Sequence, residues 1–318
     1  MADSGRVISL CSILVDVTLE VPCLPGRAGD VLATATRSQV GAGFNLVAAA
    51  ARQSVTSMYA GVHGSGRNGD MIRAALAEEG VGLTLPPRQG QDSGFCIAML
   101  EPDGQGSYIT MPGVEATLAP SDLARLAVHD DDVLALSGYD LLYPVSGPSL
   151  ISWLAAQPWG AGRGPRVLLD PGPLEAQIPD STMRSIMASV DVLTLNLREA
   201  RLLAGVPDAA GPELLANLRE HVAIPKATAI IVRSGADGSV ATGGPLGDQL
   251  LQVAAPRVTV VDSTGAGDAH TGVLAAEMVR GVPFAEAMLM ANRAAAISVT
   301  RSGPATAPTR AEIGAQFP

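Results

Sequence analysis

The chain of 318 residues has almost no lysine. Twenty of its 21 basic residues are arginine, and the single lysine is Lys226. A phosphate-binding loop of the G-x-x-x-x-G-K-[ST] type requires a lysine, so that class of nucleotide site is excluded. A protein-kinase site would need Lys226 on its nucleotide-binding strand, and no glycine-rich loop precedes this residue at the required distance. A lysine Schiff base is open only at this one position.

Aromatic residues and cysteines are also scarce. Aromatics make up 3% of the chain and hydrophobic residues 47%, so the core must consist mainly of Ala, Val, Leu and Ile. Cys11, Cys23 and Cys96 are too few and too scattered for a disulfide framework or a structural zinc site, and unpaired thiols suggest a reducing compartment. No apolar run reaches the roughly 18 residues of a membrane span, and the N-terminal segment lacks a signal-peptide cleavage site. We therefore expect a cytoplasmic protein.

Positive charge is in deficit, and the formal net charge is −10. Nucleic acids and membrane surfaces attract proteins with a basic face, so we expect neither as a partner. At roughly 100–200 residues per domain, the length fits one large α/β domain or two smaller ones.

Short apolar runs alternate with helix-like segments rich in Ala and Leu. Such alternation predicts βαβ units and a mostly parallel sheet, and continuous apolar runs are typical of strands covered on both faces. We therefore predict a three-layer α/β/α sandwich. The expected strands lie within residues 7–17, 57–62, 133–136, 167–169, 192–195 and 229–232.

Two segments without helical character interrupt this alternation. Leu19–Val40 is rich in turn residues, and Ser93–Gly113 has the pattern of a hairpin with its turn at Glu101-Pro102-Asp103-Gly104. We expect both to form a small antiparallel sheet outside the main one. The predicted division is a core of residues 1–16, 41–91 and 114–318 and a β-sheet lid of residues 17–40 and 92–113.

The strongest local signal is DSTGAGD, at residues 262–268, between an expected strand at Val258–Val261 and a long Ala-rich helix. The backbone amides of Gly265, Ala266 and Gly267 would lie at the helix N-terminus and form an anion site that needs no lysine. Asp268 would then be a general base, while the amides stabilise a transferring phosphoryl group. The alternative is an aspartate that only caps the helix.

Together with further motifs in a fixed order, this segment resembles the C-terminal signature of the ribokinase-like carbohydrate kinases, the PfkB family. The Gly41-Ala42-Gly43-Phe44-Asn45 segment resembles the family's N-terminal signature, and Asp16 resembles the sugar-binding aspartate at the end of the first strand. The remaining similar segments are Asp170-Pro171-Gly172-Pro173, the N-x-x-E motif Asn196-Leu197-Arg198-Glu199, the turn at residues 233–238, Ala291-Asn292 and Thr300–Gly303. The likeness spans roughly residues 7–310.

This resemblance implies ATP-dependent phosphorylation of a hydroxymethyl group on a small sugar, with ATP and Mg²⁺ as cofactors and K⁺ as a candidate activator. Asp268 would be the catalytic base, and Gly265, Ala266 and Gly267 the anion hole. The acceptor would contact Asp16, Gly41, Gly43 and Asn45, with Tyr139 as a further contact. The nucleotide would contact Asn196, Arg233, Gly235, Gly238, Thr264 and Asn292. Asn196 and Glu199 would act on Mg²⁺ through water, and a monovalent cation would bind near Asp262, Thr264, Val299, Ser302 and Gly303.

Several alternatives stay open at this point. The acceptor could be a nucleoside, with stacking surfaces from Phe44, Phe95, Tyr108 and Tyr139, and the chain could be a non-catalytic sugar or nucleotide sensor. Residues 64–69 fit the dinucleotide pattern G-x-G-x-x-G, but no acidic residue follows about 20 positions later, so we favour a glycine-rich turn. His270 is either a partner of the base or a helix residue near the nucleotide. The resemblance also implies a homodimer formed through the lid.

Overall fold

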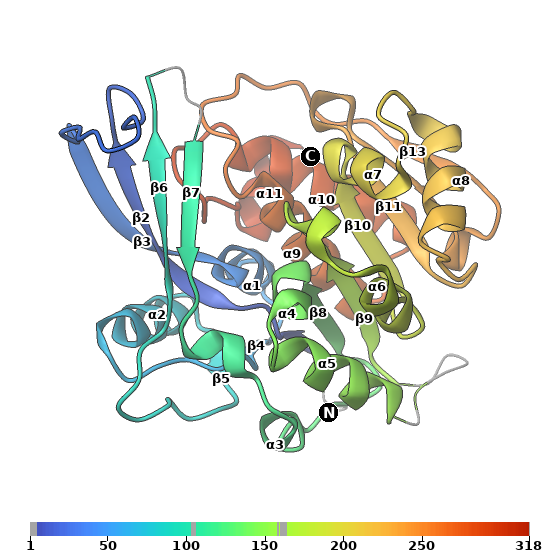
Figure 1. Cartoon of the computed structure of the whole chain (residues 1–318). Helices are drawn as coiled ribbons and strands as arrows, with labels where there is room; N and C mark the ends of the chain where they lie inside the picture. Colours follow the sequence, from blue (N-terminus) through green and yellow to red (C-terminus); the bar gives the residue numbers. More distant parts are fainter. Residues whose placement is uncertain (1–4, 103–105, 158, 160–163, 318) are drawn as a thin grey trace.

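The computed structural model describes residues 5–102, 106–157, 159 and 164–317. It contains a large nine-stranded sheet with a four-stranded sheet beside it (Figure 1). In spatial order the large sheet consists of β13 (Leu251–Val253), β12 (Ser239–Thr242), β11 (Ala229–Arg233), β10 (Val192–Asn196), β9 (Arg166–Asp170), β8 (Val133–Ser137), β1 (Val7–Ser9), β4 (Ser57–Tyr59) and β5 (Gly82–Leu83). Its strands pair in parallel except where β12 joins β11 and β13.

Helices cover both faces of this sheet, which confirms the predicted three-layer α/β/α sandwich. One face carries α1 (Gly43–Ala51), α9 (Ala266–Val279), α10 (Phe284–Ser298) and α11 (Arg310–Gln316). The other carries α3 (Pro120–Leu123), α4 (Gly138–Leu142), α5 (Ser146–Ala155), α6 (Asp180–Met187), α7 (Leu197–Ala204) and α8 (Gly211–His221). The 3-10 turns are η1 (Val114–Thr117), η2 (Glu175–Gln177), η3 (Gly235–Asp237) and η4 (Gly244–Leu246). Among the described residues, no helix has the length and apolar character needed to cross a bilayer.

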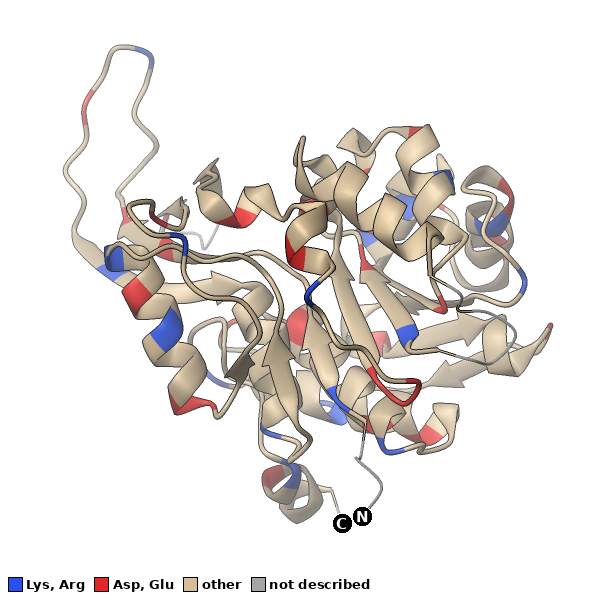
Figure 2. Cartoon of the chain, turned by 90° about the horizontal axis from the view of Figure 1, so that it is seen from below, with Lys and Arg blue, Asp and Glu red and all other residues tan. Residues whose placement is uncertain are grey.

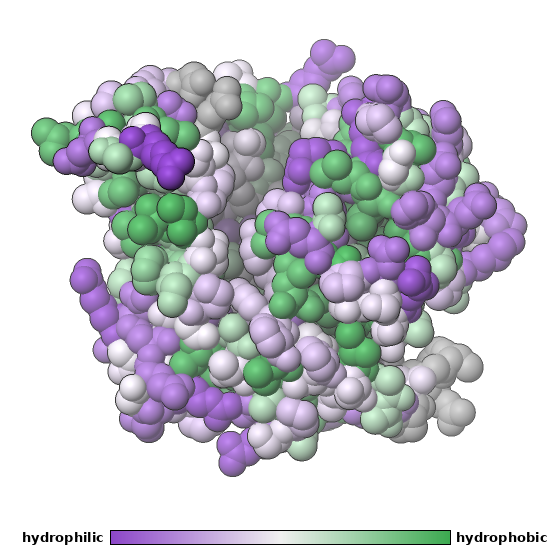
Figure 3. Space-filling model, in the orientation of Figure 1, coloured by the Kyte–Doolittle hydropathy of each residue, from purple (hydrophilic) through white to green (hydrophobic). Residues whose placement is uncertain are grey.

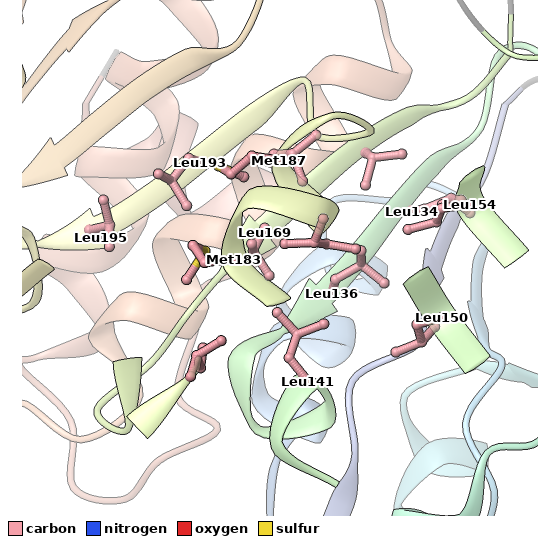
Figure 4. Close-up of a cluster of buried hydrophobic side chains, with 14 of the residues drawn as sticks. Leu134, Leu136, Leu141, Leu150, Leu154, Leu169, Met183, Met187, Leu193 and Leu195 are labelled. Carbon is pink, nitrogen blue, oxygen red and sulfur yellow. The ribbon is translucent and has the colours of Figure 1, made fainter. Parts of the chain in front are cut away.

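The strand side chains alternate between the two helical layers. Leu134 and Leu136 of β8 pack with Leu150 of α5 on one face, where a cluster of leucines and methionines fills the space between sheet and helices (Figure 4). On the other face, Leu168 of β9 packs with the alanine-rich helices α9 and α10. Burying each such side chain stabilises the fold by about 1.5–3 kcal/mol. Burial on both faces explains why the strand sequences are apolar without interruption.

The small sheet has the order β3 (Ala35–Ala42), β2 (Ile13–Glu20), β6 (Phe95–Leu100) and β7 (Gly106–Met111), and helix α2 (Arg67–Glu78) packs against β2 and β3. We call this sheet the lid. Its β2·β6 pairing is parallel, so the expectation of a purely antiparallel sheet is corrected at this pair. Of the predicted hairpin turn, residues 103 and 104 lie outside the described residues.

Two expected strands differ in the structure. The apolar run Val7–Val17 divides at Leu10–Ser12, so β1 joins the core and β2 joins the lid, and Asp16 lies within β2 rather than at the end of the first core strand. Val258–Val261 is not a strand: Val260 and Val261 are exposed, and the Val261 amide donates to the Val299 carbonyl at the end of α10. The β-branched residues of this segment suit a strand, but tertiary context decides otherwise.

Candidate active site

The order of the parallel strands reverses between β1 and β8, because β4 and β5 lie on one side of β1 and β8 to β11 on the other. Crevices at such a switch point, outside the carboxyl ends of the strands, are the usual ligand sites of open α/β sheets. A cavity of about 830 Å³ lies here, lined by both the strand ends and the lid. Figure 3 shows the hollow between the lid and the body of the molecule.

The N-terminus of α9 carries the DSTGAGD residues into this cavity. Gly265 caps the helix with a left-handed backbone (φ 73°), and a Cβ atom there would overlap the carbonyl of Pro304. Asp268 lies in the first turn, so the cap is Gly265 and the interpretation of Asp268 as a mere N-cap is wrong. The Asn45 side-chain amide donates to Asp268 Oδ2 at 3.0 Å.

Asp268 has the proton affinity of a general base. Burial raises its pKa to about 7, and the nearby carboxylates of Asp170 and Asp16 act in the same direction, while the Asn45 hydrogen bond and the Arg233 charge oppose them. A carboxylate with a pKa close to neutrality accepts a proton far more readily than an ordinary aspartate.

Arg233, at the end of β11, is the cation of the cavity wall beside α9. Its Nη1 donates to the Gly267 carbonyl at 3.0 Å and to Thr271 Oγ1 at 2.9 Å, and lies 3.0 Å from Asp170 Oδ2. Its Nη2 lies 3.8 Å from Glu199 Oε2. The guanidinium therefore ties the carboxyl ends of β9 and β11 to the first turn of α9.

Asn196 and Glu199 both line the cavity, where they cap helix α7. Asn196 Oδ1 accepts from the Glu199 amide at 2.9 Å, and Glu199 Oε2 accepts from the Asn196 amide at 2.8 Å. Burial and the neighbouring Asp170 raise the pKa of Glu199, although the Asn196 amide and Arg233 oppose this. Arg233 lies close to three carboxylates, Asp170, Glu199 and Asp268, so the local negative charge suits a divalent cation that arrives with a phosphate.

On the lid side, Asp16 faces the cavity from β2, opposite Gln39 of β3 and Cys96 of β6. Burial raises its pKa to about 6. A Cβ atom at Gly41 would overlap its carboxylate, so the glycine leaves the space that this side chain occupies. Gly43 is also closely packed, since a Cβ atom there would lie 2.7 Å from Cys11 and 2.8 Å from the Ser12 carbonyl.

Much of the cavity lining is apolar, although Ser12, Ser137 and Thr110 also line it. Leu14, Leu46, Cys96 and Leu136 line it, together with three aromatic rings, Tyr108, Tyr139 and Tyr143. Phe44 and Phe95, which the sequence offered as stacking surfaces, are absent from the cavity lining. Tyr143 was not predicted, since a lone tyrosine four residues beyond Tyr139 carries no recognisable signal.

A second unpredicted residue, Asp140, is buried behind this wall. It accepts hydrogen bonds from the Ser12 amide at 3.1 Å and from the Ser12 hydroxyl. The Ser12 carbonyl in turn accepts from the Gly43 amide at 2.9 Å, at the start of α1. Asp140 thereby fixes the bend between β1 and β2, and no local sequence pattern distinguishes it from an ordinary helix residue.

The remaining predicted nucleotide residues have mixed positions. Gly235, Gly238 and Asn292 line the cavity, whereas the neighbouring Ser263 lines it in place of Thr264. The Asn292 side chain accepts from Ser239 Oγ at 3.1 Å and donates to the Val253 carbonyl at 2.9 Å. It therefore anchors the segment after β13 that borders this end of the cavity.

The loop predicted to hold a monovalent cation is closed by its own hydrogen bonds. Asp262 accepts from the amides of Thr264 and Gly303, each at 2.9 Å, and the Val299 carbonyl accepts from the amides of Val261 and Asp262. Burial would raise the pKa of Asp262, but these amides lower it overall. The Asp262 carboxylate and the Val299 carbonyl are thus satisfied without an ion. Within the described residues, no cluster of three or more His, Cys, Asp or Glu side chains is arranged to ligate a metal.

His270 is buried beside the cavity, two residues after Asp268. Burial lowers its pKa to about 3, and the nearby Arg233 charge acts in the same direction. Neither ring nitrogen has a hydrogen-bond partner of good geometry among the described residues. The Asn292 side chain opposes this shift only in part, so the imidazole is neutral near pH 7.

The G-x-G-x-x-G segment at residues 64–69 does not line the cavity. The amides of Asn68 and Gly69 donate to the Asp92 carboxylate at 3.1 and 2.8 Å, so a side chain of the protein occupies the start of α2. The structure thus disfavours dinucleotide binding at this motif.

Figure 2 shows acidic and basic residues interspersed, with no broad basic face in that view.

These features define an α/β protein with a lid, a buried aspartate at a helix N-terminus and an adjacent arginine, as in a phosphotransferase. The family model described as "pfkB family carbohydrate kinase" matches residues 7–310. The uncharacterised sugar kinase YegV of Escherichia coli K12 is 31% identical over 310 residues, which cover 96% of this chain and 92% of that protein.

Solved structures agree on the fold. The ribokinase of Cryptococcus neoformans, crystallised with ADP, superposes with a TM-score of 0.80 at 21% identity, covering 99% of this chain and 100% of the other. The adenosine kinase of Sinorhizobium meliloti gives a TM-score of 0.79 at 20% identity over 99% and 100%. The chain belongs to the PfkB family of carbohydrate kinases, and it is a phosphotransferase that acts on a sugar hydroxyl.

Proposed function

We propose that the chain transfers the γ-phosphoryl group of ATP to a hydroxymethyl group of a small sugar or sugar-containing molecule. The observation that supports this best is the position of Asp268. Its carboxylate lies in the first turn of α9 and is held by Asn45, and Arg233 at the end of β11 donates to the Gly267 carbonyl of the same turn. A proton acceptor next to an anion site within one cavity is the arrangement that this reaction requires.

In this mechanism Asp268 accepts the proton of the acceptor hydroxyl as its oxygen attacks the γ-phosphorus. The amides of Gly265, Ala266 and Gly267 stabilise the negative charge of the transferring group, because they are fixed donors at a helix N-terminus. Arg233, which lies beside the first turn of α9, adds a positive charge near the same group. The lid covers the acceptor and limits the access of water, which would otherwise take the phosphoryl group.

Magnesium would be held near Asn196, Glu199 and Asp170, whose charges Arg233 offsets only in part. When bound with ATP, the ion neutralises phosphate charge. Asp262 and the Val299 carbonyl are already hydrogen bonded within their loop, and the proposed reaction does not require a monovalent cation there. The free cysteines and the use of ATP support a cytoplasmic setting, and the exposed lid edges support a homodimer.

A nucleoside acceptor is the second candidate, and the wall around Asp16 favours it. Three tyrosine rings offer flat apolar faces to a base, with several aliphatic side chains beside them, whereas a free sugar presents a hydroxyl on nearly every carbon and has no ring face to stack. A nucleobase next to the sugar would lay its ring face against these surfaces. Its polar edge would not be buried without a hydrogen-bond partner.

The test is ADP formation by the purified protein with Mg-ATP over a panel of sugars and nucleosides. Phosphorylation of at least one acceptor is expected, and Asp268→Asn should abolish it. Binding of panel members without any turnover would instead support a non-catalytic sensor. Within the panel, Tyr139→Ala should weaken nucleosides roughly tenfold while leaving free sugars within about twofold, if stacking contributes as it does at other aromatic sites.

A further inference from the structure

The two lid strands β6 and β7 leave the core at a single point. Gly94 directly precedes β6, and Gly113 follows the end of β7 by two residues. A Cβ atom at Gly94 would lie 2.7 Å from the Gly113 amide nitrogen, and one at Gly113 would overlap the Gly94 amide. The two backbones therefore touch here, and only glycine fits at either position. We call residues 92–94 and 113–115 the lid base.

One buried carboxylate holds both strands at the lid base. Glu115 is 2% exposed, and its Oε2 accepts from the Gly94 amide at 2.8 Å while its Oε1 accepts from the Gly113 amide at 2.7 Å. Hydrogen bonds to an ionised carboxylate are roughly twice as strong as those between neutral groups. Loss of one of them would also leave a buried donor without a partner, which raises the cost.

A second carboxylate anchors the lid base to the core. Asp92 accepts from the amides of Asn68, Gly69 and Ser93, and a Cβ atom at Gly66 would lie 2.5 Å from its Cγ. The glycines of the G-x-G-x-x-G motif thus make room for Asp92 and not for a ligand. The anionic group at the N-terminus of α2 is therefore the Asp92 carboxylate of the lid base.

The lid base connects directly to the acceptor side of the cavity. The Gly94 carbonyl accepts from the Val15 amide at 3.2 Å, and the next pair in this register joins Asp16 to Cys96. A shift of β6 at Gly94 would therefore move Asp16, and with it the acceptor, relative to Asp268. It would also open the wall that Thr110 and Tyr108 of β7 form.

We propose that Glu115 is a positioning residue for phosphoryl transfer: by holding Gly94 and Gly113 together, it sets the lid where the acceptor is aligned and water is excluded. This inference rests on the proposed function. Glu115→Gln is the direct test, because the amide NH₂ replaces one acceptor oxygen and would face a backbone N–H.

The measurement compares acceptor KM, kcat and the ratio of ADP released to acceptor phosphorylated. For Glu115→Gln we expect KM to rise roughly tenfold, the size of one lost charge-assisted hydrogen bond, and the ratio to rise above that of the wild type. The kcat should stay within about threefold. The matched control is Asp132→Asn, since Asp132 is also buried and accepts from two backbone amides, of Arg6 and His129, at the start of β8.

The control should lose thermal stability without any change in KM or in the ADP ratio. Unchanged KM and ratio in Glu115→Gln, or equal changes in Asp132→Asn, would overturn the proposal and leave Glu115 a structural residue. An absence of turnover by the wild-type protein would instead count against the proposed function. If Glu115→Gln does not fold, hydrogen exchange of the wild-type protein tests the proposal instead. The Gly94 and Gly113 amides should exchange more slowly than the amides of β7. Equal exchange rates would contradict the positioning role of Glu115.

Discussion

The two halves of the cavity are built on different principles. In the half around α9, the charged groups are already paired, Asp268 with Asn45, Arg233 with Asp170 and Thr271, and Asn196 with Glu199, although the His270 ring is not. In the half under the lid, Asp16 has no hydrogen-bond partner among the described residues, and burial raises its pKa. The charged groups of the first half are held in place by protein partners. In the second half, the hydrogen-bond partner that Asp16 lacks would be a hydroxyl of the substrate.

This difference suggests that the α9 half carries out the reaction and that the lid half selects the acceptor. Paired groups hold fixed positions, and fixed donors and charges stabilise a transition state without rearranging. An unpaired carboxylate in an apolar wall binds whichever hydroxyl can reach it, so shape and apolar contact decide among acceptors. We therefore expect substitutions around α9 to lower kcat and substitutions under the lid to raise KM.

The largest effect should follow Asp268→Asn. The amide keeps the shape but cannot accept the hydroxyl proton, so kcat should fall about a thousandfold, within the range for loss of a general base. Calorimetry should show ADP binding unchanged. Asp180→Asn, an exposed carboxylate in the first turn of α6, is the matched control and should retain full activity. A kcat within tenfold of the wild type would refute Asp268 as the base.

A smaller loss of kcat is expected from Arg233→Gln, which leaves Asp170 without its cation and removes a positive charge beside the anion site. By comparison with the loss of a single oxyanion donor, kcat should drop about a hundredfold. Arg198→Gln removes an arginine from the exposed surface of the neighbouring helix and should change kcat less than twofold. If the Arg233 variant altered only the acceptor KM, the proposed division of the cavity would be wrong.

The same division explains what could be predicted from the sequence. The α9 half is built from contiguous motifs whose glycines and polar residues have fixed spacing, so DSTGAGD and N-x-x-E indicated the fold, the family and Asp268. The lid half arises from strands that are distant in the chain. The contact between Gly41 and Asp16, the parallel β2·β6 pair and the Asp140–Ser12 link depend on register between segments, which no local pattern encodes. The valines of 258–261 misled because β-propensity depends on tertiary context, and here the segment bonds to the end of α10.

Under the lid, Gly41→Ala tests whether the position of Asp16 controls acceptor binding. The new methyl group would overlap the Asp16 carboxylate and displace it, so the acceptor KM should rise roughly thirtyfold, as for loss of a hydrogen bond to a charged group. The kcat at saturation should fall less than threefold. Gly26→Ala is the control, because nothing lies within 4 Å of its Cβ position. Equal KM values for both variants would show that Asp16 does not contact the acceptor.

The smallest effect is expected from a change of pH, which tests the role of Asp268 without altering the sequence. Because burial raises the pKa of Asp268 to about 7 and the reaction needs its ionised form, kcat should be constant above pH 8 and fall toward tenfold per pH unit well below 7. Arg233 lowers this pKa, so Arg233→Gln should move the midpoint to higher pH. Asp16, with a pKa raised to about 6, should add a second fall in kcat/KM near that pH as it loses the charge that binds the acceptor. A kcat that is flat from pH 5.5 to 8, with phosphoryl transfer shown to be rate-limiting by single-turnover measurement, would contradict a buried carboxylate base and assign the proton to another group.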